Sequence, residues 1–171
     1  MAHGVTGVST TAAVVVGAVP IPFSDAFLLS PIEIALVNAL AQIYGINKDE
    51  NSKQFLNSII EVGTVSVAAK SAISALKAIP GVNLGASIVN AIIAGCIVAA
   101  IGEGTIIAFE QVYLGKKSLS DIDWVKDLLE SKLSLQFIDL VKTVLEKVSE
   151  NTDLKSIARI IEEVFKVSLS K

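Results

Sequence analysis

The sequence predicts an all-α protein: an antiparallel helical bundle around a small-residue hydrophobic hairpin, completed by three C-terminal amphipathic helices. Apolar residues recur at helical spacing through the later segments, and no stretch shows the strand-turn-strand pattern of a β-hairpin. In addition, the stretch from Ala78 to Gly102 carries no charge. The flanking segments have to cover this stretch, with protein or with lipid.

Composition narrows the class of protein before any motif is considered. The 171 residues suffice for one domain with a core, 52% of them are hydrophobic, and the mean hydropathy is +0.65. A net charge of −3 gives no electrostatic basis for binding nucleic acid. The single cysteine, Cys96, can form no internal disulfide and is expected to be a small buried hydrophobe, which fits a reducing compartment.

Charge divides the chain unevenly. Residues 1–115 hold 11 charged side chains and residues 116–171 hold 20. We therefore expect a hydrophobic helical unit at 1–115 and an amphipathic helical extension at 116–171 that packs on it, together forming one folding unit.

The first segment, Val5 to Ala18, mixes Val, Ala and Gly without alternation. Its β-branched content would suit a strand, but the mixture favours a buried helix. Pro20 and Pro22 end it. Asp25 follows in an apolar region, where it is expected to cap a turn at 23–28 rather than to act in chemistry.

The next helix has a clear start. Ser30 is the predicted N-cap, Pro31 occupies the first helical position, and Glu33 closes a capping box. The helix is predicted to run to about Tyr44 and to stop at Gly45.

The predicted hydrophobic hairpin joins helices at 52–78 and 84–114 through a turn at Pro80 and Gly81. Small residues recur every fourth position on the second helix, which allows a close approach of another backbone. This helix-packing seam consists of Ser87, Ala91, Gly95 and Ala99, and its expected partners on the first helix are Ala68, Ala72 and Ala75.

Three amphipathic helices follow a stop at Gly115, Lys116 and Lys117. The first is capped by Ser120, and the third begins around Asp153. Their apolar residues at helical spacing are Trp124, Leu128, Leu129, Phe137, Ile138, Val141, Val144, Leu145, Val148, Leu154, Ile157, Ile160, Ile161, Val164 and Phe165.

The residues offer no catalytic or metal-binding constellation. The sole histidine, His3, lies near an end that is expected to fray, which argues against Ser-His-Asp, Cys-His and histidine-metal sites. Glu103 and Glu110 share a helix face, and we expect two solvated carboxylates there. The chain is thus predicted to be no enzyme and to need no cofactor.

The uncharged stretch is long enough to span a bilayer. Against a spanning hairpin stand Asn83 and Asn90 within it, and Glu61, Lys70 and Lys77 on the expected partner helix, each costly at mid-bilayer. A packed core is favoured, while a conditionally inserting hairpin and an integral membrane protein stay open.

Two segments resemble a known family. One runs from Ala18 through Pro20, Pro22 and Asp25 to the helix that ends in Ile43-Tyr44-Gly45-Ile46. The other contains Ile79-Pro80-Gly81-Val82, Ala100-Ile101-Gly102-Glu103 and Phe109-Glu110. Their order over about residues 8–115 resembles an uncharacterised bacterial helical domain that follows Era-like small GTPase domains. The first motif also resembles the helical domain of immunity-related GTPases of the dynamin superfamily.

The resemblance implies a non-enzymatic regulatory or interaction domain of a GTPase system, which couples nucleotide state to association with a membrane or partner. It implies that Pro20, Pro22, Asp25, Pro80 and Gly81 shape turns. The chain lacks every GTP-binding motif, so the partner would be a GTPase domain in cis or in trans, in the cytoplasm and peripheral to the inner membrane. A homodimer also stays open. The alternative is a membrane-inserting or pore-forming protein that acts through the hairpin at 52–114.

Overall fold

The computed structural model describes residues 1–18, 30–46, 49–64, 84–132 and 135–169, and these ranges are helical without any strand. The all-α prediction is therefore confirmed, including the three C-terminal helices. The described helices are α1 (Ala2–Gly17), α2 (Ser30–Ile43), α3 (Glu50–Thr64), α5 (Ala86–Tyr113), α6 (Ile122–Lys132), α7 (Leu135–Lys147) and α8 (Leu154–Leu169).

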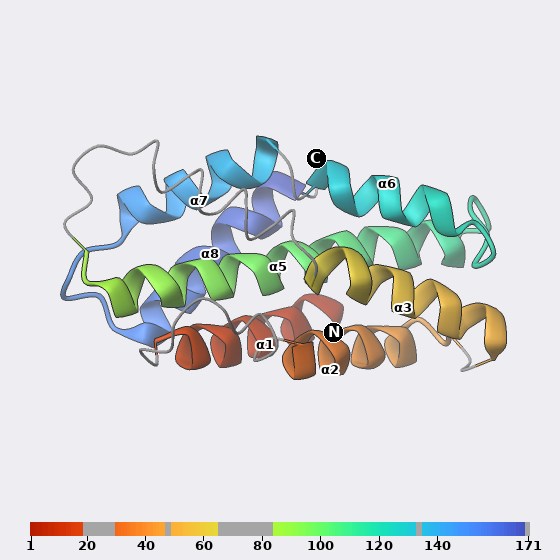
Figure 1. The fold of residues 1–171 in the computed structure, drawn as a ribbon, viewed down its shortest axis with the longest axis horizontal. Helices are drawn as coiled ribbons and strands as arrows, with labels where there is room; N and C mark the ends of the chain where they lie inside the picture. Colours follow the sequence, from red (N-terminus) through yellow and green to blue (C-terminus); the bar gives the residue numbers. More distant parts are fainter. Residues whose placement is uncertain (19–29, 47–48, 65–83, 133–134, 170–171) are drawn as a thin grey trace.

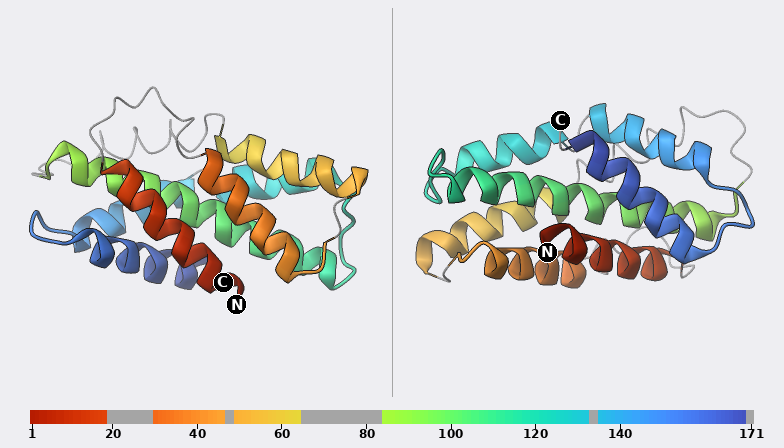
Figure 2. Two further views of the ribbon diagram at one scale, coloured as in Figure 1. Left: turned by 90° about the horizontal axis from the view of Figure 1, so that it is seen from below. Right: turned by 180° about the vertical axis from the view of Figure 1, so that it is seen from behind.

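Helix α5 is the axis of the bundle. It runs along the length of the molecule (Figure 1) and contacts each of the other described helices. Helices α1, α7 and α8 lie mainly around its first half, and α2, α3 and α6 around its second half (Figures 1 and 2). Its residues from Ala91 to Ile106 are all buried, which explains why this segment carries almost no charge.

Aromatic side chains mark the core in each half. Phe109 on α5 lies 5.7 Å from the Tyr44 ring in an edge-to-face arrangement and 6.3 Å from the Phe55 ring. In the other half, Phe137 on α7 meets Phe165 on α8 at 6.1 Å. Such pairs add to the burial free energy of their rings.

Local capping fixes several helix ends. Gly45 adopts φ +68°, and the Ile46 N–H donates to the Ala41 carbonyl at 2.9 Å, so the predicted stop is confirmed. At the start of α8, the Ser156 N–H donates to Asp153 Oδ1 at 3.0 Å, which agrees with the predicted start near Asp153. The Ser120 cap is wrong: the Trp124 N–H donates to Asp121 Oδ1 at 3.2 Å, so Asp121 caps α6.

The small-residue seam has one partner, α1, that was not predicted. The described seam of α5 packs against α1, which runs antiparallel to it, while the described part of α3 contacts mainly α2 and α6. The reason is that α1 is uncharged and brings its own glycines and threonines to the contact. The expected partners Ala68, Ala72 and Ala75 lie outside the described residues.

Helix α5 is also long and apolar enough to cross a membrane. Within the described residues this holds for one segment, Ser87–Tyr113, and 94% of its most apolar window is buried inside the bundle. A buried core helix meets the same criterion of length and composition, so the finding is weak evidence for a membrane span.

Cys96 is expected to be unreactive in the folded protein. Its side chain is fully buried on α5, and this burial raises the pKa of the thiol, so that the reactive thiolate is scarce at neutral pH. Ellman's reagent should label the thiol slowly in buffer and completely in denaturant. Rapid labelling of the native protein would contradict the packing around α5.

Candidate functional site

The junction between α1 and α5 brings the two backbones unusually close. A Cβ atom added at Gly17 would lie 2.7 Å from Ala94 Cβ and 2.8 Å from the Asn90 carbonyl oxygen. A Cβ at Gly95 would lie 2.6 Å from Val14 Cγ2, and one at Gly102 would overlap Thr6. Real side chains essentially never approach so closely, so α1 depends on glycines on both helices to reach its place.

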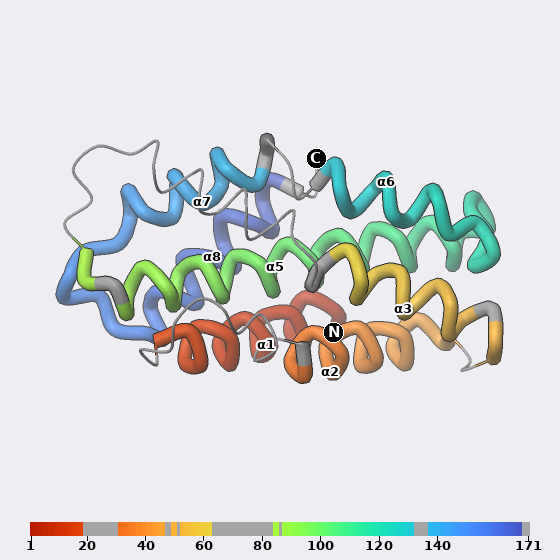
Figure 3. Tube along the Cα trace, in the orientation of Figure 1, coloured from red at the N-terminus to blue at the C-terminus, as the bar shows by residue number. Residues whose placement is uncertain are grey.

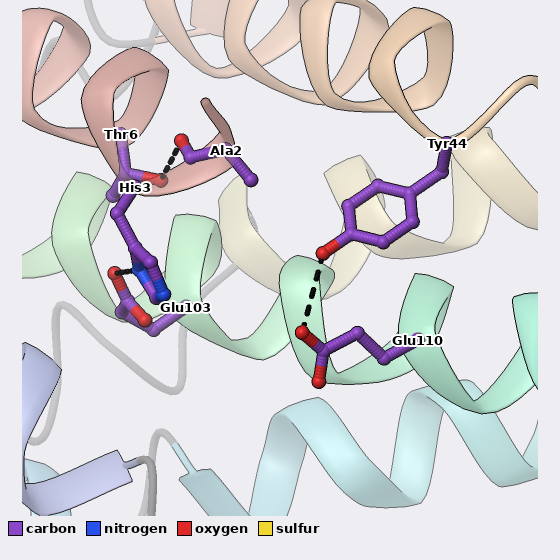
Figure 4. Close-up of polar contacts among 6 residues, drawn as sticks. All are labelled: Ala2, His3, Thr6, Tyr44, Glu103 and Glu110. Atoms are coloured by element: carbon purple, nitrogen blue, oxygen red, sulfur yellow. Dashed lines mark hydrogen bonds and ion pairs between the residues drawn. The ribbon is translucent and has the colours of Figure 1, made fainter.

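A histidine–carboxylate pair closes one end of this junction. His3 Nδ1 on α1 lies 3.0 Å from Glu103 Oε1 on α5 (Figure 4), and a proton on Nδ1 is donated to the carboxylate. His3 is half-exposed, whereas Glu103 is buried. The expectations of a frayed end at His3 and of a solvated carboxylate at Glu103 are therefore wrong. His3 lies in the first turn of α1, and Glu103 is buried.

A pocket of about 240 Å³ opens beside this pair. Its polar lining comes from α1, α5 and α8, and burial raises the pKa of Glu162, an effect that the nearby charge of Arg159 opposes. The carboxyl of Glu162 occupies the space where a Cβ of Gly7 would be, at 2.8 Å. The lining residues are His3, Gly4, Thr6, Gly7, Ala99, Glu103, Glu162, Phe165 and Lys166.

The pocket lining holds a histidine–carboxylate pair and contains no serine or cysteine. Glu103 could orient His3 as a base, but the hydroxyl in the lining, that of Thr6, donates to the carbonyl of Ala2 at 3.4 Å instead (Figure 4). Among the described residues no group of three His, Cys, Asp or Glu side chains is placed to hold a metal ion. The pair thus joins α1 to α5 at this end of the junction.

The second carboxylate of this helix face has a different environment. Glu110 is exposed, and its Oε1 accepts a hydrogen bond from the Tyr44 hydroxyl at 3.3 Å (Figure 4). Partial burial, with the charge and the hydrogen bond of Glu110, raises the pKa of Tyr44 to about 12. The expectation of a solvated carboxylate thus holds for Glu110 and fails for Glu103.

Removing the imidazole of His3 should cost more than removing the hydroxyl of Tyr44. His3→Ala leaves the buried Glu103 carboxylate without this partner and is expected to lower the free energy of unfolding by about 1 kcal/mol. Tyr44→Phe removes a 3.3 Å hydrogen bond to the exposed Glu110 carboxylate and should change the free energy of unfolding by less than about 0.5 kcal/mol. Urea unfolding measures both, and equal losses would contradict the assignment of Glu103 as the buried acceptor.

Glu33 is a further buried carboxyl group, in the first turn of α2. It is 1% exposed, its Oε2 has no hydrogen-bond partner in the described part of the chain, and burial raises its pKa to about 7. The capping box predicted a glutamate in this first turn, and the structure adds that its side chain lies in the interior. Whether the carboxylate reaches back to the Ser30 N–H lies outside the described contacts.

Other predicted site residues are placed as follows. Pro31 lies exposed in the first turn of α2, while the side chain of Ser30 falls outside the described side chains. In the seam, Ala91, Gly95 and Ala99 are buried, but Ser87 is exposed. The turn residues Pro20, Pro22, Asp25, Pro80 and Gly81 lie outside the described residues.

The outer surface of α1 and α2 carries no charged side chain. These two helices lie side by side on one side of the bundle (Figure 2), and Glu33, the one Asp, Glu, Lys or Arg between them, is buried. Val8 is 73% and Val15 is 51% exposed. We call this the α1–α2 surface; its exposed apolar residues are Val8, Ala12, Val15, Pro31, Ile34, Ala35 and Ile43.

Comparison with known proteins gives one match. A family model with the description "Domain of unknown function (DUF697)" matches residues 3–134, from the first turn of α1 to the end of α6. No curated protein and no solved structure matches the chain.

Proposed function

The chain belongs to the family described as Domain of unknown function (DUF697), and from this premise we propose that it is a non-enzymatic interaction domain that binds a GTPase domain. The GTPase partner comes from the resemblance of the segments around Pro20 and Pro80 to domains that follow small GTPases. We place the complex in the cytoplasm, peripheral to the inner membrane.

One observation carries the choice of binding site. The α1–α2 surface exposes Val8, Val15 and Ile34 on two helices whose one Asp, Glu, Lys or Arg, Glu33, is buried. Exposed apolar patches without charge are typical of protein interfaces, whose cores are depleted of charged residues.

The architecture also supplies a route for coupling. Helix α1, which forms part of this surface, packs on α5 through contacts with Gly95 and Gly102, and α5 contacts every other described helix. A partner that prefers one position of α1 would therefore bias the packing of the whole bundle. A change of the nucleotide bound to the GTPase would then change the packing of this bundle.

Binding between this chain and a GTPase domain encoded in the same or a neighbouring gene tests the proposal. Calorimetry with GDP and with a non-hydrolysable GTP analogue should give affinities that differ by at least about tenfold, in the usual range of allosteric coupling. Val8→Asp should weaken the tighter complex, because it buries a charge in the interface.

Val167→Asp is the matched control, since Val167 is similarly exposed on α8 but lies outside the α1–α2 surface. Circular dichroism should show that both variants keep the helical content of the parent. Equal affinity in the two nucleotide states, or equal weakening by Val8→Asp and Val167→Asp, would contradict the proposal.

A second candidate function rests on the length of α5. The most apolar 18-residue window of its segment Ser87–Tyr113 has a mean hydropathy of 2.1, and the segment is long enough to span a bilayer once α1 and α8 move away. A membrane-inserting protein of this kind should release a dye trapped in liposomes. An intact dye signal with both neutral and anionic lipids would exclude it.

A further inference from the structure

The corner between α5 and α6 is a backbone-locked turn at one end of the molecule (Figure 3). Gly115 adopts φ +67°, the Gly115 N–H donates to the Val112 carbonyl, and the Lys116 N–H donates to the Gln111 carbonyl, both at 2.9 Å. This pair of bonds is the Schellman motif, which only a residue tolerant of positive φ can close. Side chains on the corner are therefore held on a fixed scaffold.

These side chains combine exposed apolar groups with cations. Tyr113 is 75% and Leu114 is 59% exposed, and they are followed by Lys116 and Lys117, which are exposed as well. Tyr113 and Leu114 are adjacent and both face water, so a partner that covers them would gain the free energy of burying their apolar surface.

The charges at the corner are partly engaged. Lys117 Nζ lies 3.8 Å from Asp121 Oδ2 and 5.1 Å from the centre of the Trp124 ring. In the part of the chain that the structure describes, no carboxylate forms an ion pair with Lys116. The nearby carboxylate of Glu110 accepts the Tyr44 hydroxyl. Lys116 is thus the cation that is available for an external anion.

We propose that this corner, Tyr113 to Lys117, binds the surface of a lipid bilayer that contains anionic lipids. Tyrosine and leucine enter the headgroup region while lysines contact lipid phosphates, which is the usual chemistry of interfacial anchors. One convex turn of five residues cannot bury the roughly 800 Å² per partner that a stable protein interface needs. A lipid bilayer needs no such contact area, because individual side chains can insert among its headgroups.

The net charge of −3 works against unspecific attraction of the chain to such a bilayer. Binding must therefore depend on the local apolar and cationic groups of the corner. This inference rests on the peripheral location proposed above and names the surface that would contact the membrane; that surface differs from the proposed GTPase-binding surface, so either proposal can fail without the other.

The only tryptophan of the chain, Trp124, gives a local probe, since it is half-buried beneath Lys117. Vesicles of phosphatidylcholine with about one third phosphatidylglycerol should quench its emission when their acyl chains are brominated near the headgroup. Phosphatidylcholine vesicles alone should quench it far less. The full chain is used, without nucleotide or partner, so this result is independent of GTPase binding.

Two variants of the corner should weaken binding without unfolding the protein, because they change exposed side chains. Lys116→Glu should lower the partition coefficient by roughly tenfold at low salt, and the double variant Tyr113→Ser with Leu114→Ser by at least as much. Val167→Ser, which removes an equally exposed valine from α8, is the control and should leave the coefficient unchanged.

The proposal is overturned if anionic vesicles leave the Trp124 emission unchanged. It is also overturned if vesicles bind and the corner variants bind as tightly as the parent, or if Val8→Ser on the α1–α2 surface abolishes binding while the corner variants do not. If the corner binds a protein and not lipid, anionic vesicles will leave the Trp124 emission unchanged, and the proposal fails.

Discussion

Replacing Glu33 by glutamine is expected to raise the free energy of unfolding by about 3 kcal/mol at about pH 8. The parent has to hold a carboxylate in the protein interior at that pH, and the glutamine variant does not. Burial raises the pKa of Glu33 from 4.5 to about 7, and each pKa unit is worth about 1.36 kcal/mol. Urea unfolding at two pH values measures the change.

The same group sets the sign of the pH dependence. Between 4.5 and about 7, the folded protein keeps a proton on Glu33 that the unfolded chain has already released. The contribution of this group to stability is therefore fully present below 4.5, falls as pH rises, and is lost once the pH passes about 7. Glu33→Gln should remove this slope, so its effect should shrink toward zero at about pH 4.

Glu50→Gln provides the matched control for this effect. Glu50 also lies in the first turn of a helix, α3, but its side chain is 83% exposed and pairs with Lys53 at 2.7 Å. Its replacement should change stability by less than about 0.5 kcal/mol at either pH. If Glu33→Gln behaves like Glu50→Gln, the Glu33 carboxyl is solvated and the pKa assignment is wrong.

The helix ends show how much local sequence determines. Gly45, Asp153 and Gly115 were predictable because turn and cap chemistry needs only neighbouring residues. The predicted cap of α6 was one residue off, at Ser120 instead of Asp121. Serine and aspartate are both favoured N-caps, so composition does not distinguish two such neighbours. Periodicity likewise predicts which helices are amphipathic, and this is why the three C-terminal helices were foreseen.

Pairing between distant segments was harder to foresee. The seam of α5 offers small residues that fit any small-residue helix, and both α1 and the segment 52–78 provide such a surface. No local pattern links His3 to Glu103, which lies 100 residues away. Nor does a capping-box pattern reveal that the side chain of Glu33 is buried. A glycine count on α1, with Gly7 and Gly17 in an uncharged helix, was the available signal for the close contact with α5.

Replacing Gly17 by valine is expected to lower the free energy of unfolding by about 3 kcal/mol, the upper range for overpacking. A new Cβ would lie 2.8 Å from the Asn90 carbonyl oxygen and 3.1 Å from Ala91 Cα. These are backbone atoms of α5, so the clash is relieved only when α1 moves away from α5. Gly95→Val should cost less, because its nearest neighbours are side-chain atoms of Val14 and Ile161 and not backbone atoms.

Gly4→Val tests whether the lower stability of Gly17→Val comes from the clash with α5 or from replacing a helical glycine as such. Gly4 lies in the same helix and has no atom within 4 Å of an added Cβ, so valine there should be neutral or slightly stabilising through its better helix propensity. Thermal unfolding should therefore rank the proteins as Gly4→Val and parent, then Gly95→Val, then Gly17→Val. Similar losses at Gly4 and Gly17 would show that α1 does not depend on backbone contact with α5. The route from the α1–α2 surface to the rest of the bundle would then have no rigid connection at this junction.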